Sequence, residues 1–234
     1  MKIGIVNADN IGRHLATSWA RHGHDIMLSK DTSPEKLRTR IQELGSSKGL
    51  AETELAKFKY GSLVEAANFG DVILFSVYFP RLGHVLLELQ RAGVTLSRKI
   101  VIDTMNPLNV DENFNHYHDI ECMQKTSTAE EVQKAFPEAI VFKAFNAFGA
   151  TLLDASNWTS SRVPPVIFIG GDSSSTDTAR KLIEDAGFRP RFAGHNLRDA
   201  GLLERLGGIL SHRLAENEFN GDANIAFDIV QSKA

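Results

Sequence analysis

The sequence predicts an α/β protein built on a mostly parallel β-sheet with helices on both faces. Short β-branched runs alternate with stretches of helical periodicity almost from end to end, which is the pattern of a doubly wound sheet. No internal repeat or low-complexity linker interrupts this alternation. The 234 residues, 42% of them hydrophobic, suffice for one large domain with a substantial core. We therefore expect a single domain over residues 1–234.

Apolar runs and helix-start signals place the elements along the chain. Ser33 followed by Pro34 is a typical helix start, because serine caps the first turn and proline presets its backbone. Other helices show apolar residues at three- and four-residue steps. About eight strands are expected, at residues 2–6, 25–29, 58–61, 71–77, 99–105, 139–145, 165–171 and 188–192, and helices at about 10–22, 33–44, 62–68, 81–92, 129–136, 174–186 and 197–214.

Two connections are longer than usual, at about residues 106–127 and 146–163. Long loops of this kind in compact domains tend to serve function. Each follows a predicted strand, so both should lie at the carboxyl edge of the sheet, where open α/β sheets bind ligands.

Composition excludes several function classes. The net charge of −3 leaves no basic stripe for nucleic acid, and no apolar run approaches the roughly 20 residues that cross a bilayer. The single cysteine, Cys122, rules out an internal disulfide, and the first residues lack the features of a secretory signal. We expect a cytoplasmic protein without nucleic-acid or membrane partners. The apolar face of residues 202–214, within a C-terminal helix and tail at about 197–234, favours a homodimer.

The first strand leads into the turn where dinucleotide-binding proteins carry GxGxxG. Here residues 7–12 read NADNIG, so only Gly12 remains, at the position that serves close helix-to-strand packing. Asn7 can adopt the left-handed conformation of the first glycine. The turn predicts a Rossmann-like NAD(P)-binding fold, with cofactor contacts at Asn7, Ala8, Asp9, Asn10, Ile11, Gly12 and Arg13.

Asp9 is the main departure within this turn. It stands where a small residue normally lets the backbone touch the pyrophosphate, and it brings bulk and negative charge. Arg13 could neutralise that charge or contact a phosphate. The alternative is that Asp9 or Asn10 only caps the helix and that the turn holds no cofactor.

The end of the second strand decides which dinucleotide fits. An acidic residue there would bind the ribose 2′-hydroxyl of NAD, whereas this chain has Ser29 and Lys30. A hydroxyl and a cation suit a 2′-phosphate, with Lys36 or Arg38 nearby, so NADP is the predicted cofactor. The alternative is that Lys30 is an ordinary solvated lysine.

Six segments together resemble one family. In chain order they are IGIVNADNIGRHLA, LFSVYF, VIDTMNPLN, VFKAFNAFGA, VIFIGGD and LIEDAGFRPRFAG. Their order and spacing are similar to those of the NADPH-dependent coenzyme F420 reductases, also called F420-dependent NADP oxidoreductases. The resemblance implies a doubly wound sheet, NADPH in the turn and a deazaflavin stacked on the nicotinamide.

The resemblance also assigns site residues. It implies that Ser29 and Lys30 contact the 2′-phosphate. It further implies that Ser76, Val77 and Phe79 border the nicotinamide half of the cofactor, that Asn106 and Pro107 belong to an NPL element, and that Asn146, Ala147 and Phe148 line the pocket for the second ring. The chain departs from the family at Asn7 and Asp9, at Tyr78 in place of a common proline, and at Gly201 in place of a common arginine.

Other reactive residues give weaker signals. The segment HYHDIEC at 116–122 contains zinc-ligand residue types, but its spacing is not a recognised ligand frame, so we interpret it as a packed or solvated loop and predict no metal. Nothing near Cys122 indicates a stabilised thiolate. No nucleophile or triad motif is present, so no catalytic side chain is predicted. His195 and His212 are expected at the surface, and Glu204 as a buried structural carboxylate.

Three functions remain open. The leading hypothesis is an NADP-dependent oxidoreductase that passes a hydride between NADP(H) and a small-molecule acceptor, a flavin-like or deazaflavin (F420-type) ring. Such transfer between stacked rings needs positioning and exclusion of water more than an acid or base. The alternative is a non-catalytic dinucleotide-fold protein used for partner binding or sensing. A reductase of a small carbonyl or imine is less favoured, because no proton donor is evident at a strand end.

Overall fold

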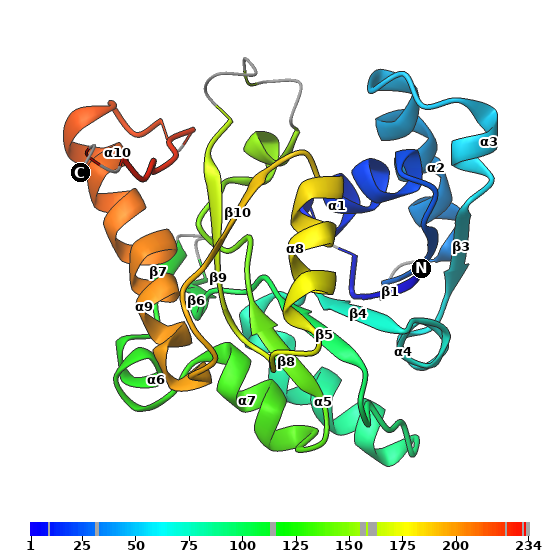
Figure 1. Cartoon of the computed structure of the whole chain (residues 1–234), viewed down its shortest axis with the longest axis horizontal. Helices are drawn as coiled ribbons and strands as arrows, with labels where there is room; N and C mark the ends of the chain where they lie inside the picture. The colour runs from blue at the N-terminus through cyan, green and yellow to red at the C-terminus, as the bar shows by residue number, and fades with distance from the viewer. Residues whose placement is uncertain are drawn as a thin grey trace.

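A computed structural model gives the fold and describes residues 1–8, 10–30, 33–112, 116–154, 158, 163–222, 224–230 and 232. Its centre is an eight-stranded sheet of order β10-β9-β8-β5-β4-β1-β2-β3 (Figure 1). The predicted α/β class with about eight strands is confirmed. The strands are β1 (Lys2–Val6), β2 (Asp25–Ser29), β3 (Phe58–Gly61), β4 (Val72–Phe75), β5 (Ile100–Asp103), β8 (Ile140–Lys143), β9 (Pro165–Gly170) and β10 (Arg189–Phe192).

Strand direction determines which loops meet at one edge. The six strands from β3 to β8 in the sheet pair in parallel, whereas β9 runs antiparallel to β8, with Phe142 opposite Gly170. β10 is parallel to β9. The segments that follow β1, β4, β5 and β8 therefore share the carboxyl edge, as the sequence predicted for the two long connections.

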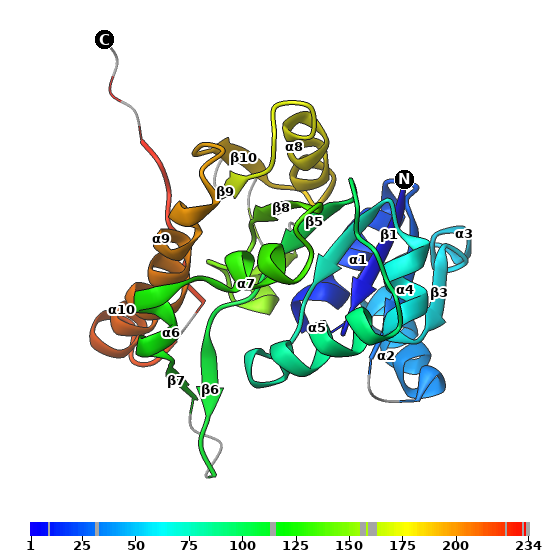
Figure 2. The same cartoon turned by 90° about the horizontal axis from the view of Figure 1, so that it is seen from below.

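Helices cover both faces of the sheet (Figures 1 and 2). One face packs against α1, α2 and α8, with the fully buried Trp19 at its centre. The other face packs against α4, α5 and α7. The bounds of these helices are α1 (Asn10–Arg21), α2 (Pro34–Ser47), α4 (Leu63–Phe69), α5 (Leu82–Arg91), α7 (Thr128–Ala135) and α8 (Thr176–Asp185); a short α3 (Glu52–Leu55) was not predicted.

The predicted loop at 106–127 is wrong in part, because it contains regular structure. A small hairpin of β6 (Leu108–Val110) and β7 (His116–His118) is followed by α6 (Ile120–Lys125). Asp119 connects the two, since its Oδ2 accepts a hydrogen bond from Asn109 Nδ2 and its Oδ1 accepts one from the Cys122 amide, at 3.0 and 2.9 Å. Three-residue strands are too short for a periodic sequence pattern to reveal them.

The single helix predicted at 197–214 is divided and extends further. It consists of a 3-10 turn (Leu197–Asp199), α9 (Ala200–Glu204), a π-helical turn (Arg205–Leu210) and α10 (Ser211–Glu218). Further 3-10 turns lie at Phe79–Arg81 and Ala150–Leu153. Figure 2 places α9 and α10 beside α6 and the β6–β7 hairpin. Within the described ranges, the structure has no helix with the length and apolar character that a bilayer span requires.

Candidate functional site

The first residue of the turn after β1 has the conformation expected for a dinucleotide fold. Asn7 has a φ of 58°, so it adopts the left-handed conformation that the missing first glycine would supply. Its amide donates to Ser29 Oγ at 3.2 Å, and the Ala8 amide donates to the Ser29 carbonyl at 2.6 Å. Within the described part of the chain, the buried Asn7 Oδ1 has no hydrogen-bond partner. Asp9 lies outside the described residues.

Gly12 seats the first helix tightly on the sheet. A Cβ at this position would lie 3.0 Å from Ile5 Cγ2 and 3.1 Å from Ser76 Oγ, closer than a side chain normally packs. The Gly12 amide donates to Ser76 Oγ at 3.1 Å. The packing role predicted for this glycine is confirmed. Next to it, Arg13 donates a hydrogen bond to Asn10 Oδ1 in the first turn of α1.

Ser29 does not present its hydroxyl to a ligand, contrary to expectation. The side chain is fully buried, and its Oγ donates to the Ile5 carbonyl at 2.9 Å while accepting from the Asn7 amide. Ser29 therefore stabilises the turn through hydrogen bonds to backbone groups. Lys30 is partly exposed and Lys36 is exposed. The Arg38 guanidinium lies 5.3 Å from the centre of the Tyr60 ring, an interaction that keeps it beside β3.

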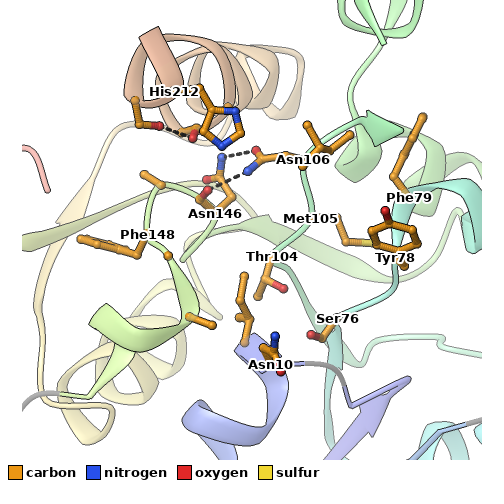
Figure 3. A pocket seen from close by; sticks show the side chains of 18 of the residues that line it. Asn10, Ser76, Tyr78, Phe79, Thr104, Met105, Asn106, Asn146, Phe148 and His212 are labelled. Carbon is orange, nitrogen blue, oxygen red and sulfur yellow. Dashed lines mark hydrogen bonds between the residues drawn. The ribbon is translucent and has the colours of Figure 1, made fainter. Parts of the chain in front are cut away.

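One cavity of about 440 Å³ lies at the carboxyl edge (Figure 3). It joins the first turn of α1 to the segments that follow β4, β5 and β8. Two wider and more open depressions, of about 500 and 920 Å³, run along α6 and α7 and carry charged side chains such as Lys125 and Glu131. The lining of the 440 Å³ cavity is Asn10, Ile11, Ser76, Val77, Tyr78, Phe79, Thr104, Met105, Asn106, Leu108, His118, Asn146, Ala147, Phe148, Gly149, Ala150, Gly207, Gly208, Ser211, His212 and Ile225.

Some of the predicted site residues line the cavity, and others do not. It brings together Asn10, Ile11, Ser76, Val77, Phe79, Asn106, Asn146, Ala147 and Phe148. Pro107 does not line it, and its carbonyl accepts the Asp119 amide at 2.9 Å. Asn7, Ala8, Gly12, Arg13, Ser29, Lys30 and Lys36 also lie outside its lining.

Two asparagine side chains join the loops after β5 and β8 at one side of the cavity (Figure 3). Asn106 Nδ2 donates to the Asn146 carbonyl, and Asn146 Nδ2 donates to Asn106 Oδ1, both at 2.8 Å. Asn146 Nδ2 also donates to the Leu203 carbonyl on α9 at 2.7 Å. The residue before it, Phe145, has a φ of 62°, a rare conformation for a bulky residue. Its ring is held in the core, 6.4 Å from the ring of Trp19.

A buried cluster of charges lies beneath this side of the cavity. Lys143 Nζ donates to Asp103 Oδ2 at 2.9 Å, to Glu204 Oε1 at 2.7 Å, and to the carbonyl of Met105, which lines the cavity. Thr128 Oγ1 accepts a hydrogen bond from Lys143 Nζ and lies 2.6 Å from Asp103 Oδ2 and 2.8 Å from Glu204 Oε1, so its single proton is donated to one of the two carboxylates. Glu204 is fully buried, as predicted for a structural carboxylate. The cluster fixes α9 to the central strands.

The pKa values in this cluster follow from burial and pairing. Burial raises the pKa of the Asp103 carboxyl, against the opposing effect of the Lys143 ammonium. Burial alone would lower the pKa of Lys143, but the two carboxylates more than offset it, so the pKa of Lys143 is raised. Both partners thus retain protons more strongly than they would in water.

The structure also brings together two histidines that the sequence did not connect. His118 Nε2 and His212 Nδ1 lie 3.1 Å apart, and both rings line the cavity. His212, expected at the surface, is only partly exposed. The described residues contain no group of three or more histidine, cysteine or acidic side chains arranged to hold a metal. Burial raises the pKa of the Cys122 thiol to about 11, so it is no activated nucleophile.

Comparisons with known proteins bear on this arrangement. Residues 2–107 match the sequence model of the family described as "NADP oxidoreductase coenzyme F420-dependent". The predicted family resemblance is confirmed. The match covers β1 to β5, the turn after β1 and the NPL element at Asn106–Pro107. The loop after β8 and the C-terminal helices lie beyond it.

Solved structures and curated relatives extend the likeness in fold. An Arthrobacter protein named as a candidate F420-dependent NADP-reductase aligns with a TM-score of 0.76 and 22% identity over 99% of this chain and 100% of its own. A Sinorhizobium meliloti protein of unassigned function gives 0.66 and 21% over 86% and 88%. The Rattus norvegicus metalloreductase STEAP3 is 25% identical over 190 residues, 81% of this chain and 33% of STEAP3. The chain spans a third or less of the length of the curated relatives it matches.

Proposed function

We propose that the chain is an NADP-dependent oxidoreductase that passes a hydride between NADP(H) and a flat-ring acceptor of flavin or deazaflavin type. The observation that carries the proposal is the 440 Å³ cavity, whose lining includes the first turn of α1 and the Asn106–Asn146 pair. Open α/β sheets bind dinucleotides at this edge. None of the described lining residues is Asp, Glu, Lys or Arg, and such a mainly apolar wall suits flat rings.

The described residues fit a bound dinucleotide. Gly12 leaves no room for a side chain between α1 and Ser76, so the helix amino terminus stays close to the strand ends, where its dipole favours a phosphate. Ser76 and Thr104 would border the nicotinamide. Asn146 and Ala147 would border the second ring, because the Phe148 ring packs against Phe188 in the core, with ring centres 5.6 Å apart. When bound, the nicotinamide supplies the hydride. The protein positions the rings and excludes water.

Cofactor choice gives the first prediction. NADPH should bind more tightly than NADH, and Lys30→Ala should weaken NADPH alone by about 1 to 3 kcal/mol, the loss of a charge-assisted hydrogen bond. Titration calorimetry with both nucleotides measures this, with the exposed Lys134→Ala on α7 as a matched control. Equal affinities, or a preference for NADH, would refute NADP as the cofactor.

A second candidate function is non-catalytic: the dinucleotide fold would serve partner binding or sensing. One observation favours it: the amides of Asn7, Ala8 and Gly12 already donate to Ser29 and Ser76, which reduces the donors left for a pyrophosphate. A homodimer and a cytoplasmic location remain predictions. The exposed Leu202, with 60% of its surface accessible, lies on the face that the sequence assigns to a dimer.

Asp9→Gly separates the two functions. Because the motif assigns position 9 to the pyrophosphate contact, removing the bulk and negative charge of Asp9 should raise NADPH affinity by about one to two powers of ten. The free energy of unfolding should fall by about 0.5 to 1 kcal/mol, because glycine adds entropy to the unfolded chain.

The isosteric Asp9→Asn variant separates charge from bulk, since it keeps the size and should recover only the electrostatic part of the gain. Calorimetric titration of all three proteins measures the affinities. If neither variant binds NADPH better than the parent, and the parent binds it only at millimolar concentration, the non-catalytic function is the correct one.

A further inference from the structure

The histidine pair is built from two distant segments. His118 ends β7 and His212 lies in the first turn of α10, 94 positions later, yet their rings share a hydrogen bond of 3.1 Å and their centres are 5.1 Å apart. Gly208 makes this approach possible, because a Cβ there would lie 3.2 Å from His118 Nδ1. The π-helical turn that contains Gly208 is a feature that often marks functional sites.

The pair differs chemically from the rest of the cavity wall. Apart from the Tyr78 phenol, the other described lining residues have no side chain that titrates in the usual pH range of proteins. Burial lowers the pKa of His118, and His212 and Arg213 lower it further, while Glu216 opposes them. His118 is therefore mostly neutral at pH 7 and can take up and return a proton through its neighbour.

We infer that His118 and His212 form a proton-supplying pair for the acceptor bound in this cavity. The inference rests on the proposed function and narrows its substrate class to acceptors that take a hydride on carbon and a proton on a conjugated nitrogen or oxygen. Deazaflavins and imines share this chemistry. The pair also supplies the proton donor that the sequence did not reveal at a strand end.

The acceptor receives one hydride and one proton. The acceptor carbon gains a hydride with its two electrons from the reduced nicotinamide, which leaves as the oxidised cation. The acceptor heteroatom gains one proton from the His118–His212 pair, whose net charge falls by one. The pair then recovers one proton from solvent through the partly exposed His212.

Two tricyclic acceptors of similar shape test the inference. Reduction of 5-deazariboflavin requires a proton, whereas the 10-methylacridinium cation accepts a hydride at carbon and needs none. His212→Asn should lower NADPH-dependent reduction of 5-deazariboflavin by about 100-fold or more, the usual contribution of a positioned acid. Reduction of 10-methylacridinium, corrected for the uncatalysed rate, should stay within about twofold. His118→Asn should act in the same direction, and the wild-type deazaflavin rate should fall with rising pH while the acridinium rate stays flat.

A measurement without cofactor or acceptor tests the pair directly. In ¹³C-histidine NMR spectra, the two imidazoles should titrate in two coupled steps, because one proton is shared between neighbouring rings. Each single Asn variant should restore one ordinary step in the remaining histidine. Independent titration in the wild type would overturn the inference.

Other results of these experiments distinguish a failure of the inference from a failure of the proposed function. Equal losses with both acceptors would make the histidines structural and overturn the inference, and so would a selective loss in Tyr78→Phe with none in His212→Asn. A wild type that reduces the acridinium but not the deazaflavin keeps the hydride-transfer function and overturns proton supply. A wild type that reduces neither overturns both.

Discussion

Replacing Lys143 by methionine is expected to lower the free energy of unfolding by about 3 to 5 kcal/mol, the usual cost of removing one partner from a buried ion pair. Asp103 and Glu204 would then lie in the core without the ammonium that binds both at 2.7 to 2.9 Å. Urea unfolding measures the loss. Lys99→Met is the matched control, because Lys99 Nζ donates only to the carbonyls of Ala67 and Asn68 in its hydrogen bonds.

The loss should depend on pH in a defined direction. Burial already raises the pKa of Asp103, and without Lys143 it rises further. A carboxyl with a higher pKa in the folded chain stabilises the fold fully below its unfolded value of about 4, and this contribution is lost as the pH rises through the folded pKa.

Lys143→Met should therefore be more damaging at pH 8 than at pH 5, and adding Glu204→Gln should restore part of the stability. An equal loss at both pH values, with no rescue, would mean that Lys143 acts through packing alone.

Local sequence patterns were sufficient for the elements of this fold. Short runs rich in β-branched or aromatic residues located all eight sheet strands, and the turn sequence placed Asn7 in the left-handed conformation that the structure has. Gly12 likewise packs as its place in the motif predicts. Each of these features follows from a local periodicity or motif, so it can be predicted from the sequence.

Contacts between distant segments were not predictable in this way. The sequence places Lys143 in a strand but does not indicate its partners, because only the fold brings it to Asp103 and Glu204. Ser29 has the right residue type and position for a phosphate contact, yet its hydroxyl is used within the turn. His118 and His212 meet only because a π-helical turn with two glycines lets α10 approach the hairpin. No spacing in the sequence encodes that geometry.

Substitution of Gly207, the first of those two glycines, should also have a large effect on the free energy of unfolding. A Cβ on Gly207 would lie 2.5 Å from the Asn146 carbonyl oxygen and 2.7 Å from Ala147 Cα. Both are backbone atoms, so no side chain can rotate away, and the helix must move off the loop that carries Asn146. We expect Gly207→Ala to lower the free energy of unfolding by about 3 kcal/mol, at the upper end of the usual cost of overpacking.

Gly201→Ala, six positions earlier, should have the opposite sign. Its Cβ would meet only Arg205 Nη1, at 3.2 Å, the far end of a flexible side chain, and alanine in a helix gains about 0.5 to 1 kcal/mol over glycine. Urea unfolding gives both free energies. Hydrogen exchange at residues 146–150 reports the loop, which should lose protection in Gly207→Ala alone because the Asn146 bond to Leu203 is broken. If both alanine variants were equally stable and equally protected, α9 and its π-helical turn would not pack against the Asn146 loop, and the cavity wall that holds His212 would have to be placed differently.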